Sequence, residues 1–193
     1  MVRKMDTRSV KSMVPESIQL LIYCRNFDVH YTLLLRRYER FKEINVPGNF
    51  DIDAITYLDM IVVQLRALCI ESNIHKNNYT AQILLRKLGY PDLAERIDHM
   101  LGESFFEEED SASVTIREAL KLLADKFICH YDNYDAPEQD NQHRAIIIEQ
   151  QLKNPYMSRN LDYIMNTIIS CIGKGIQDKT GERICPSNPS STL

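Results

Sequence analysis

Thr115-Ile-Arg-Glu-Ala-Leu-Lys-Leu-Leu-Ala-Asp-Lys-Phe-Ile-Cys-His-Tyr-Asp-Asn133 is the stretch of sequence that decides the fold. We expect an amphipathic α-helix here, because apolar residues recur at intervals of three and four positions. His130 falls on the apolar stripe, and Lys126, four residues earlier, lies at its edge. This arrangement indicates either a buried polar cluster with satisfied partners or a functional site. The stripe itself consists of Ile116, Ala119, Leu120, Leu123 and Phe127.

The other long segments of the chain also repeat at helical spacing, which predicts an all-α fold. The apolar positions of the first helix include Ile18, Leu21, Ile22, Val29, Leu33, Leu34 and Tyr38. Residues 143–152 fit a short strand as well as a helix, because three isoleucines stand in a row. The polar stretches 104–113 and 131–142 are expected to be loops. The expected helices run from Glu16 to the Pro47-Gly48-Asn49 turn, from Asp51 or Asp53 past Cys69, from Tyr79 to Leu88, from Pro91 to about Met100, from Thr115 to His130, and from about Arg159 to Gln177.

These helices predict a bundle of long antiparallel helices with two short helices inserted. We expect a single domain over residues 14–180, between a flexible basic N-terminus of residues 1–13 and a flexible tail of residues 181–193. Cys69 and Cys171 lie in apolar helical patterns and are interpreted as small core residues.

Composition narrows the class of protein. The 193 residues carry a net charge of -4, which argues against broad nonspecific attraction to nucleic acid but permits a local basic face. The N-terminal sequence lacks the apolar run of a secretory signal, and no apolar stretch approaches the roughly 20 residues needed to span a bilayer. No membrane partner is therefore expected. Five widely spaced cysteines without a Cys-x-x-Cys pair favour a reducing, cytoplasmic setting.

Three short sequences carry a resemblance to a known family. They are Leu65-Arg66-Ala67-Leu68 on a long helix, Thr80 to Leu88 on a short one, and Asp125 to Asn133 at the end of a later one. In this order they resemble the HEPN superfamily of helical bundles, especially its abortive-infection and phage-defence branch. Members are commonly dimeric, metal-independent ribonucleases or toxins, and others are inactive relatives that bind RNA or nucleotides.

The resemblance implies roles for individual residues. Asp125, Lys126 and His130 match the family pattern Arg-Asp-Lys-x-x-Ala-His, and they are the candidate catalytic residues. His130 would act as acid or base, and Lys126 would stabilise phosphate charge. Ala124 stands where the family carries its arginine. The candidate residues for binding the substrate are Arg66, Asp132 and Asn133.

The function expected from this resemblance is a HEPN-like protein that binds or acts on RNA as a degenerate, poorly catalytic relative. A homodimer is expected, with the helix of residues 115–130 or the first long helix near its interface. The alternatives are an active defence or toxin endoribonuclease, a purely protein-binding helical module, and a phosphotransfer bundle with an active histidine. No metal and no cofactor are expected, because the sequence has neither a cluster with metal-ligand spacing nor a P-loop.

Overall fold

A computed structural model describes residues 16–46, 51–71, 80–106, 114–128 and 139–180. These residues are almost entirely helical, which confirms the predicted all-α class. They contain no strand, and their one isolated β-bridge joins Ser104 to Thr115. The elements are α1 (Glu16–Ile44), α2 (Ile52–Leu65), η1 (Arg66–Ile70), α3 (Ala81–Leu88), α4 (Pro91–Gly102), α5 (Ile116–Leu122), η2 (Leu123–Ile128), α6 (Gln139–Lys153) and α7 (Leu161–Thr180).

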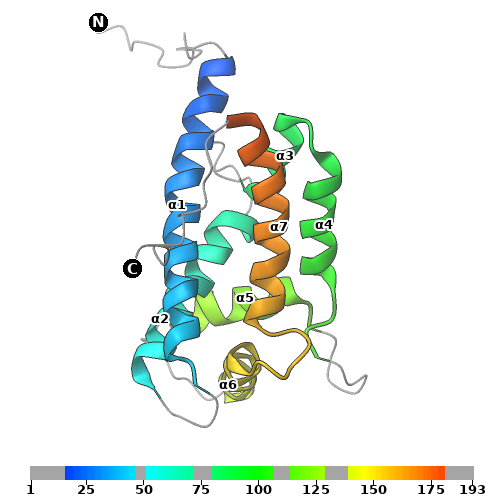
Figure 1. The fold of residues 1–193 in the computed structure, drawn as a ribbon. Helices are drawn as coiled ribbons and strands as arrows, with labels where there is room; N and C mark the ends of the chain where they lie inside the picture. Colours follow the sequence, from blue (N-terminus) through cyan, green and yellow to red (C-terminus); the bar gives the residue numbers. More distant parts are fainter. Residues whose placement is uncertain (1–15, 47–50, 72–79, 107–113, 129–138, 181–193) are drawn as a thin grey trace, which may run out of the picture.

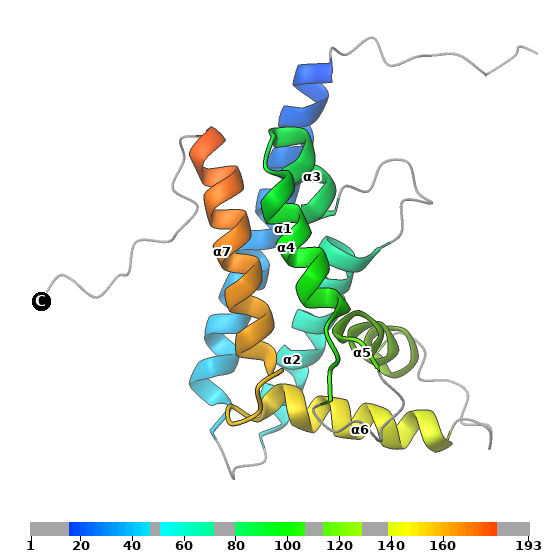
Figure 2. The ribbon, with the colours of Figure 1, turned by 90° about the vertical axis from the view of Figure 1, so that its right-hand side faces the viewer.

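The helices form an upright bundle closed at one end by a crossing helix. Helices α1, α4 and α7 run roughly along the same axis, whereas α6 lies across the lower end of the bundle (Figures 1 and 2). The N-terminal part of α1 projects beyond the rest of the bundle (Figure 1). The arrangement is therefore a bundle with one transverse layer, and α3 and α4 are the short helices between its long ones.

Sequence signals place several helix ends where they were predicted. Asp51 caps α2, and its side chain accepts a hydrogen bond from the backbone N–H of Asp53. Thr115 caps α5 in a capping box with Glu118, in which each side chain bonds the other residue's backbone N–H. The Glu118 carboxylate accepts hydrogen bonds from both the backbone N–H and the hydroxyl of Thr115, and these two bonds lower the pKa of Glu118. Gly89 ends α3 with a φ of 90°, a conformation that glycine adopts without steric cost.

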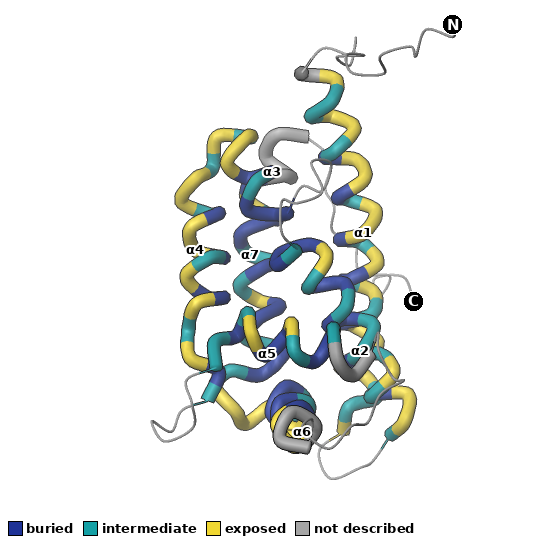
Figure 3. The backbone as a smooth tube through the Cα atoms, turned by 180° about the vertical axis from the view of Figure 1, so that it is seen from behind, coloured by how far each residue is buried: buried dark blue, intermediate teal, exposed yellow. Residues whose placement is uncertain are grey.

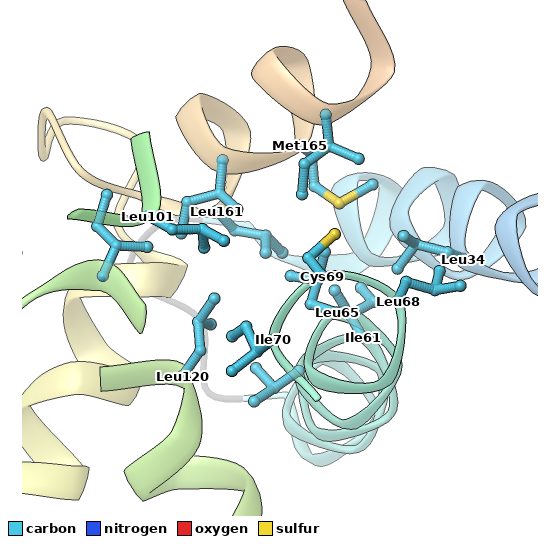
Figure 4. Packing of buried hydrophobic residues seen from close by; sticks show 14 of the residues in the cluster. Leu34, Ile61, Leu65, Leu68, Cys69, Ile70, Leu101, Leu120, Leu161 and Met165 are labelled. Atoms are coloured by element: carbon cyan, nitrogen blue, oxygen red, sulfur yellow. The ribbon is translucent and has the colours of Figure 1, made fainter. Parts of the chain in front are cut away.

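One continuous core joins all the helices. Leu34 of α1, Leu65 and Cys69 of the α2–η1 segment, and Met165 of α7 meet in its centre (Figure 4). Cys69 and Cys171 are buried, as predicted. Burial raises the pKa of Cys69 to about 12, so its thiol stays protonated and chemically inert at neutral pH.

Most of the apolar positions named for the first helix do not face the core. Only Leu34 and Tyr38 of that set are buried, and the other five side chains are exposed. The inner face is instead lined by Cys24, Phe27, Tyr31, Leu34, Tyr38 and Phe41. These residues repeat at intervals of three and four positions, so the aromatic residues form the core stripe of this helix.

Other boundaries also differ from the sequence prediction. Residues 143–152 are helical, because α6 buries Ala145, Ile148 and Leu152 at intervals of three and four. This helix begins at Gln139, so the predicted loop was too long at its C-terminal end. The predicted turn at 47–49, most of the predicted loop at 104–113 and the predicted tail lie outside the described residues. Within the described part of the chain, no helix is both long and apolar enough to cross a bilayer.

Candidate functional site

Two π-helical segments were not predicted, and they define the candidate site. η1 extends α2, and the backbone N–H of Glu71 bonds the carbonyl of Arg66, five residues earlier. η2 extends α5 in the same way from Leu123 to Ile128. η1 packs against α5, and η2 packs against α2. Short π-helical turns within α-helices are frequent at functional sites, because they redirect side chains that a regular helix would hold elsewhere.

One ion pair connects the two π-helical segments. The Arg66 Nη2 atom lies 2.7 Å from the Asp125 Oδ1 atom. Both side chains remain partly accessible, with 31% of Arg66 and 36% of Asp125 exposed. Two of the residues selected from the sequence, 59 positions apart in the chain, therefore meet in space. An ion pair with this exposure is worth only about 0–1 kcal/mol, so an incoming anion can replace the carboxylate at small cost.

Ala124 has a structural reason to be small. Its side chain is fully buried, with 0% of its surface exposed, and it lies in η2 between Leu123, which is also buried, and Asp125. An arginine at this position would point into the core and could not reach a phosphate in solvent. The guanidinium group that the described part of the chain places beside Asp125 belongs to Arg66, on the neighbouring segment.

Four of the other residues selected from the sequence cannot be placed. His130, Asp132 and Asn133 lie outside the described residues, as does the side chain of Lys126. The apolar stripe that leads to them is confirmed through Ile116, Ala119, Leu120 and Leu123, all of which are buried. His99 and His143 are exposed.

A second polar cluster lies on the neighbouring elements and was not predicted. Asp98 of α4 contacts two guanidinium groups, with Arg86 Nη2 of α3 at 2.6 Å and Arg117 Nη2 of α5 at 3.3 Å. Gln82 is buried, and its side-chain nitrogen donates to Asp98 and to the carbonyl of Cys69 in η1. This amide therefore links the cluster to the first π-helical segment.

No local pattern in the sequence joins these residues. Arg86 and Asp98 are 12 positions apart, and Asp98 and Arg117 are 19 apart. The contact arises only when α3, α4 and α5 pack around the same edge of the bundle. Two half-exposed arginines share one carboxylate here, so the cluster keeps an excess positive charge.

A third group of charges joins α2 to the transverse helix α6. Burial of the Asp59 carboxyl, with a smaller contribution from the charge of Glu149, raises its pKa to about 6. Lys153 opposes this rise, and its Nζ atom lies 2.8 Å from Glu149 Oε1. Because the Asp59 carboxyl titrates at about pH 6, the charge at the closed end of the bundle changes with pH. These three side chains form neither a nucleophilic site nor a metal site.

The described residues hold no group of three or more His, Cys, Asp or Glu side chains that is arranged to bind a metal ion. No family model, curated protein or solved structure matches the chain. The proposed function therefore rests on the fold and on the contact between Arg66 and Asp125.

Proposed function

We propose that this protein binds single-stranded RNA at the junction of η1 and η2, with Arg66 as the main contact to phosphate, and that it cleaves RNA poorly. The observation that carries the proposal is the partly exposed Arg66–Asp125 ion pair between two π-helical segments. Its arginine has five N–H donors in a rigid planar group, and this geometry suits a phosphate. One N–H group faces Asp125, so other donors remain for a ligand.

The second polar cluster supports the same proposal. Arg117 and Arg86 lie on elements adjacent to η1, and Gln82 connects their shared Asp98 to the backbone of that segment. Three guanidinium groups thus lie on η1 and on its neighbours α3 and α5, opposed by two carboxylates. A chain of phosphates is the class of ligand that gains most from several such cations, because each contact releases a counterion.

Weak catalysis follows from the chemistry of the position before Asp125. Ala124 supplies no donor, and its burial prevents a cation there from reaching a phosphate. Arg66 provides a positive charge from a neighbouring element, which supports binding. His130 belongs to the proposal through the sequence alone, as the residue available to act as acid or base. Robust cleavage would instead support the alternative of an active endoribonuclease.

The test measures RNA affinity by fluorescence anisotropy with a labelled single-stranded oligonucleotide of mixed sequence. Arg66→Ala is expected to weaken binding about tenfold, the loss of one charge-assisted contact. Asp125→Asn is expected to tighten binding, because it removes the carboxylate that competes with phosphate for the same guanidinium. Arg66→Lys keeps the charge but loses the planar group, so its affinity should be intermediate.

Arg36→Ala provides the matched control. Arg36 is also an exposed arginine, but it lies on the outer side of α1, opposite to the buried residues that face η1. Its removal changes the net charge by the same amount and should leave affinity nearly unchanged. Equal losses in Arg66→Ala and Arg36→Ala would reduce the binding to general electrostatics and contradict the proposed site. Cleavage is followed on the same RNA in the presence of EDTA, with His130→Ala as the reference.

A further inference from the structure

The outer face of α1 carries an exposed row of apolar side chains that nothing in the described structure covers. Ile18, Ile22, Val29 and Leu33 are 48%, 49%, 56% and 40% exposed, and Leu21 beside them is 64% exposed. The inner side of the same helix is packed against the core, so this row points away from the bundle. Figure 3 shows the exposed outer side of α1, including the part that projects beyond the other helices. A row of this kind on a surface indicates an interaction site.

The spacing of the four residues in the row is symmetric about its centre. Ile18 and Ile22 are four residues apart, Ile22 and Val29 are seven apart, and Val29 and Leu33 are four apart. If two copies of α1 pack antiparallel about a point between Arg25 and Asn26, Ile18 faces Leu33 of the second copy and Ile22 faces its Val29. Every apolar residue of the row then meets an apolar residue. This is the self-complementarity that a two-fold symmetric interface requires.

We propose that a second copy of this chain covers the outer face of α1, in an antiparallel helix pair centred between residues 25 and 26. The row extends over about 22 Å of helix, at 1.5 Å per residue, which is long enough for four apolar contacts on each side. A parallel pair would instead place Arg36 directly against Arg36, whereas the antiparallel pair separates the two Arg36 side chains along the helix axes. Arg25 lies close to Arg25 of the second copy in either arrangement, and its long apolar stem lets the guanidinium reach solvent.

This interface is separate from the proposed RNA site. The apolar row lies on the side of α1 opposite to Phe27, Tyr31 and Leu34, which are buried in the core. Loss of the dimer is therefore expected to leave the Arg66–Asp125 pair in place. A failure of the dimer and a failure of RNA binding can be observed independently in the same variants.

Sedimentation equilibrium on the full chain tests the interface. Wild type is expected to show a mass near twice the 22.5 kDa of the chain at micromolar concentration. Ile22→Glu and Val29→Glu should each raise the dimer dissociation constant by about a hundredfold, because carboxylates then replace apolar contacts at two places in each dimer. Circular dichroism should show unchanged helix content, since both side chains are half exposed.

Ile146→Glu is the matched control, because Ile146 of α6 is 50% exposed and lies far along the chain on another element. It should leave the dimer intact. A monomeric wild type from low micromolar to near-millimolar concentration would overturn the proposal. A dimer that survives both Ile22→Glu and Val29→Glu would do the same.

Cross-linking distinguishes the antiparallel from the parallel arrangement. Under mild oxidation, Arg25→Cys should form a disulfide between the copies, because residue 25 lies next to the two-fold axis. Ile18→Cys should not, since the two copies of residue 18 would be about 22 Å apart along the helices. Oxidised wild type gives the background from native cysteines. Cross-linking of Ile18→Cys above that background would contradict the antiparallel pair.

Discussion

Replacing Ala124 with arginine tests whether the position before Asp125 belongs to the core or to a phosphate site. Ala124 is fully buried, with 0% of its surface exposed. An arginine there adds a long side chain to a packed region, at a cost of about 1–3 kcal/mol, and buries an unpaired charge, at several kcal/mol more. The sum of about 5 kcal/mol or more is comparable with the whole stability of an ordinary domain. Ala124→Arg should therefore be largely unfolded and gain no ribonuclease activity.

The assay is denaturant unfolding followed by circular dichroism, with Ala67→Arg as the matched control. Ala67 also lies in a π-helical segment but is exposed, directly after Arg66. Ala67→Arg should change stability by less than about 0.5 kcal/mol, and it should tighten RNA binding by adding a cation beside Arg66. An Ala124→Arg protein that folds with wild-type stability would refute the assignment of this side chain to the core. Added cleavage activity in such a protein would restore the ribonuclease prediction.

Three further predictions concern packing and pH. A methyl group at Gly175 would overlap Leu85 Cδ2. Gly175→Ala should therefore lose about 1 kcal/mol of stability in thermal unfolding, although alanine has the better helix propensity. The control is Gly102→Ala, whose methyl group would meet no atom within 4 Å, so it should be neutral or stabilising. Leu123→Ala should cost about 2–5 kcal/mol in a urea titration, because Leu123 is only 2% exposed, and a loss below about 0.5 kcal/mol would show that its face is not buried. The folded state holds the Asp59 proton more tightly than the unfolded state. This carboxyl therefore lowers stability as the pH rises from 3.8, the ordinary pKa of an aspartate, through its raised pKa of about 6. Asp59→Asn should therefore stabilise the protein at neutral pH, and its advantage should fade below about pH 4, as measured by denaturant unfolding at a series of pH values. An advantage that does not change with pH would contradict the assigned pKa.

The fold class and most helix ends could be predicted because they depend on local chemistry. Asp51, Thr115, Gly89 and Pro91 each satisfy or interrupt backbone hydrogen bonds within a few residues, so their effect is visible in the sequence. The core face of α1 does not follow from its apolar positions. Apolar residues occur on both sides of that helix, and helical periodicity alone does not say which side meets the bundle. The regular spacing of Phe27, Tyr31, Tyr38 and Phe41 was the signal that could have identified it.

The candidate site was only partly accessible to sequence reasoning. Arg66 and Asp125 were selected separately, but their contact depends on how the α2–η1 and α5–η2 segments pack. The π-helical turns have no sequence signature here, since the same residues fit a regular helix. The Asp98 cluster was missed because Gln82, Arg86 and Arg117 become neighbours only in the folded chain. The role assigned to His130 remains a prediction from the sequence.

The salt dependence of RNA binding tests most directly whether Arg66 contacts a phosphate. Each phosphate neutralised on single-stranded nucleic acid adds about 0.7 to the slope of log affinity against log salt concentration. Measured over the same salt range, Arg66→Ala should show a slope shallower than that of wild type by about 0.7, whereas Arg36→Ala should keep the wild-type slope. Parallel lines for wild type and Arg66→Ala would show that this arginine neutralises no phosphate, which would contradict the proposed function of the site.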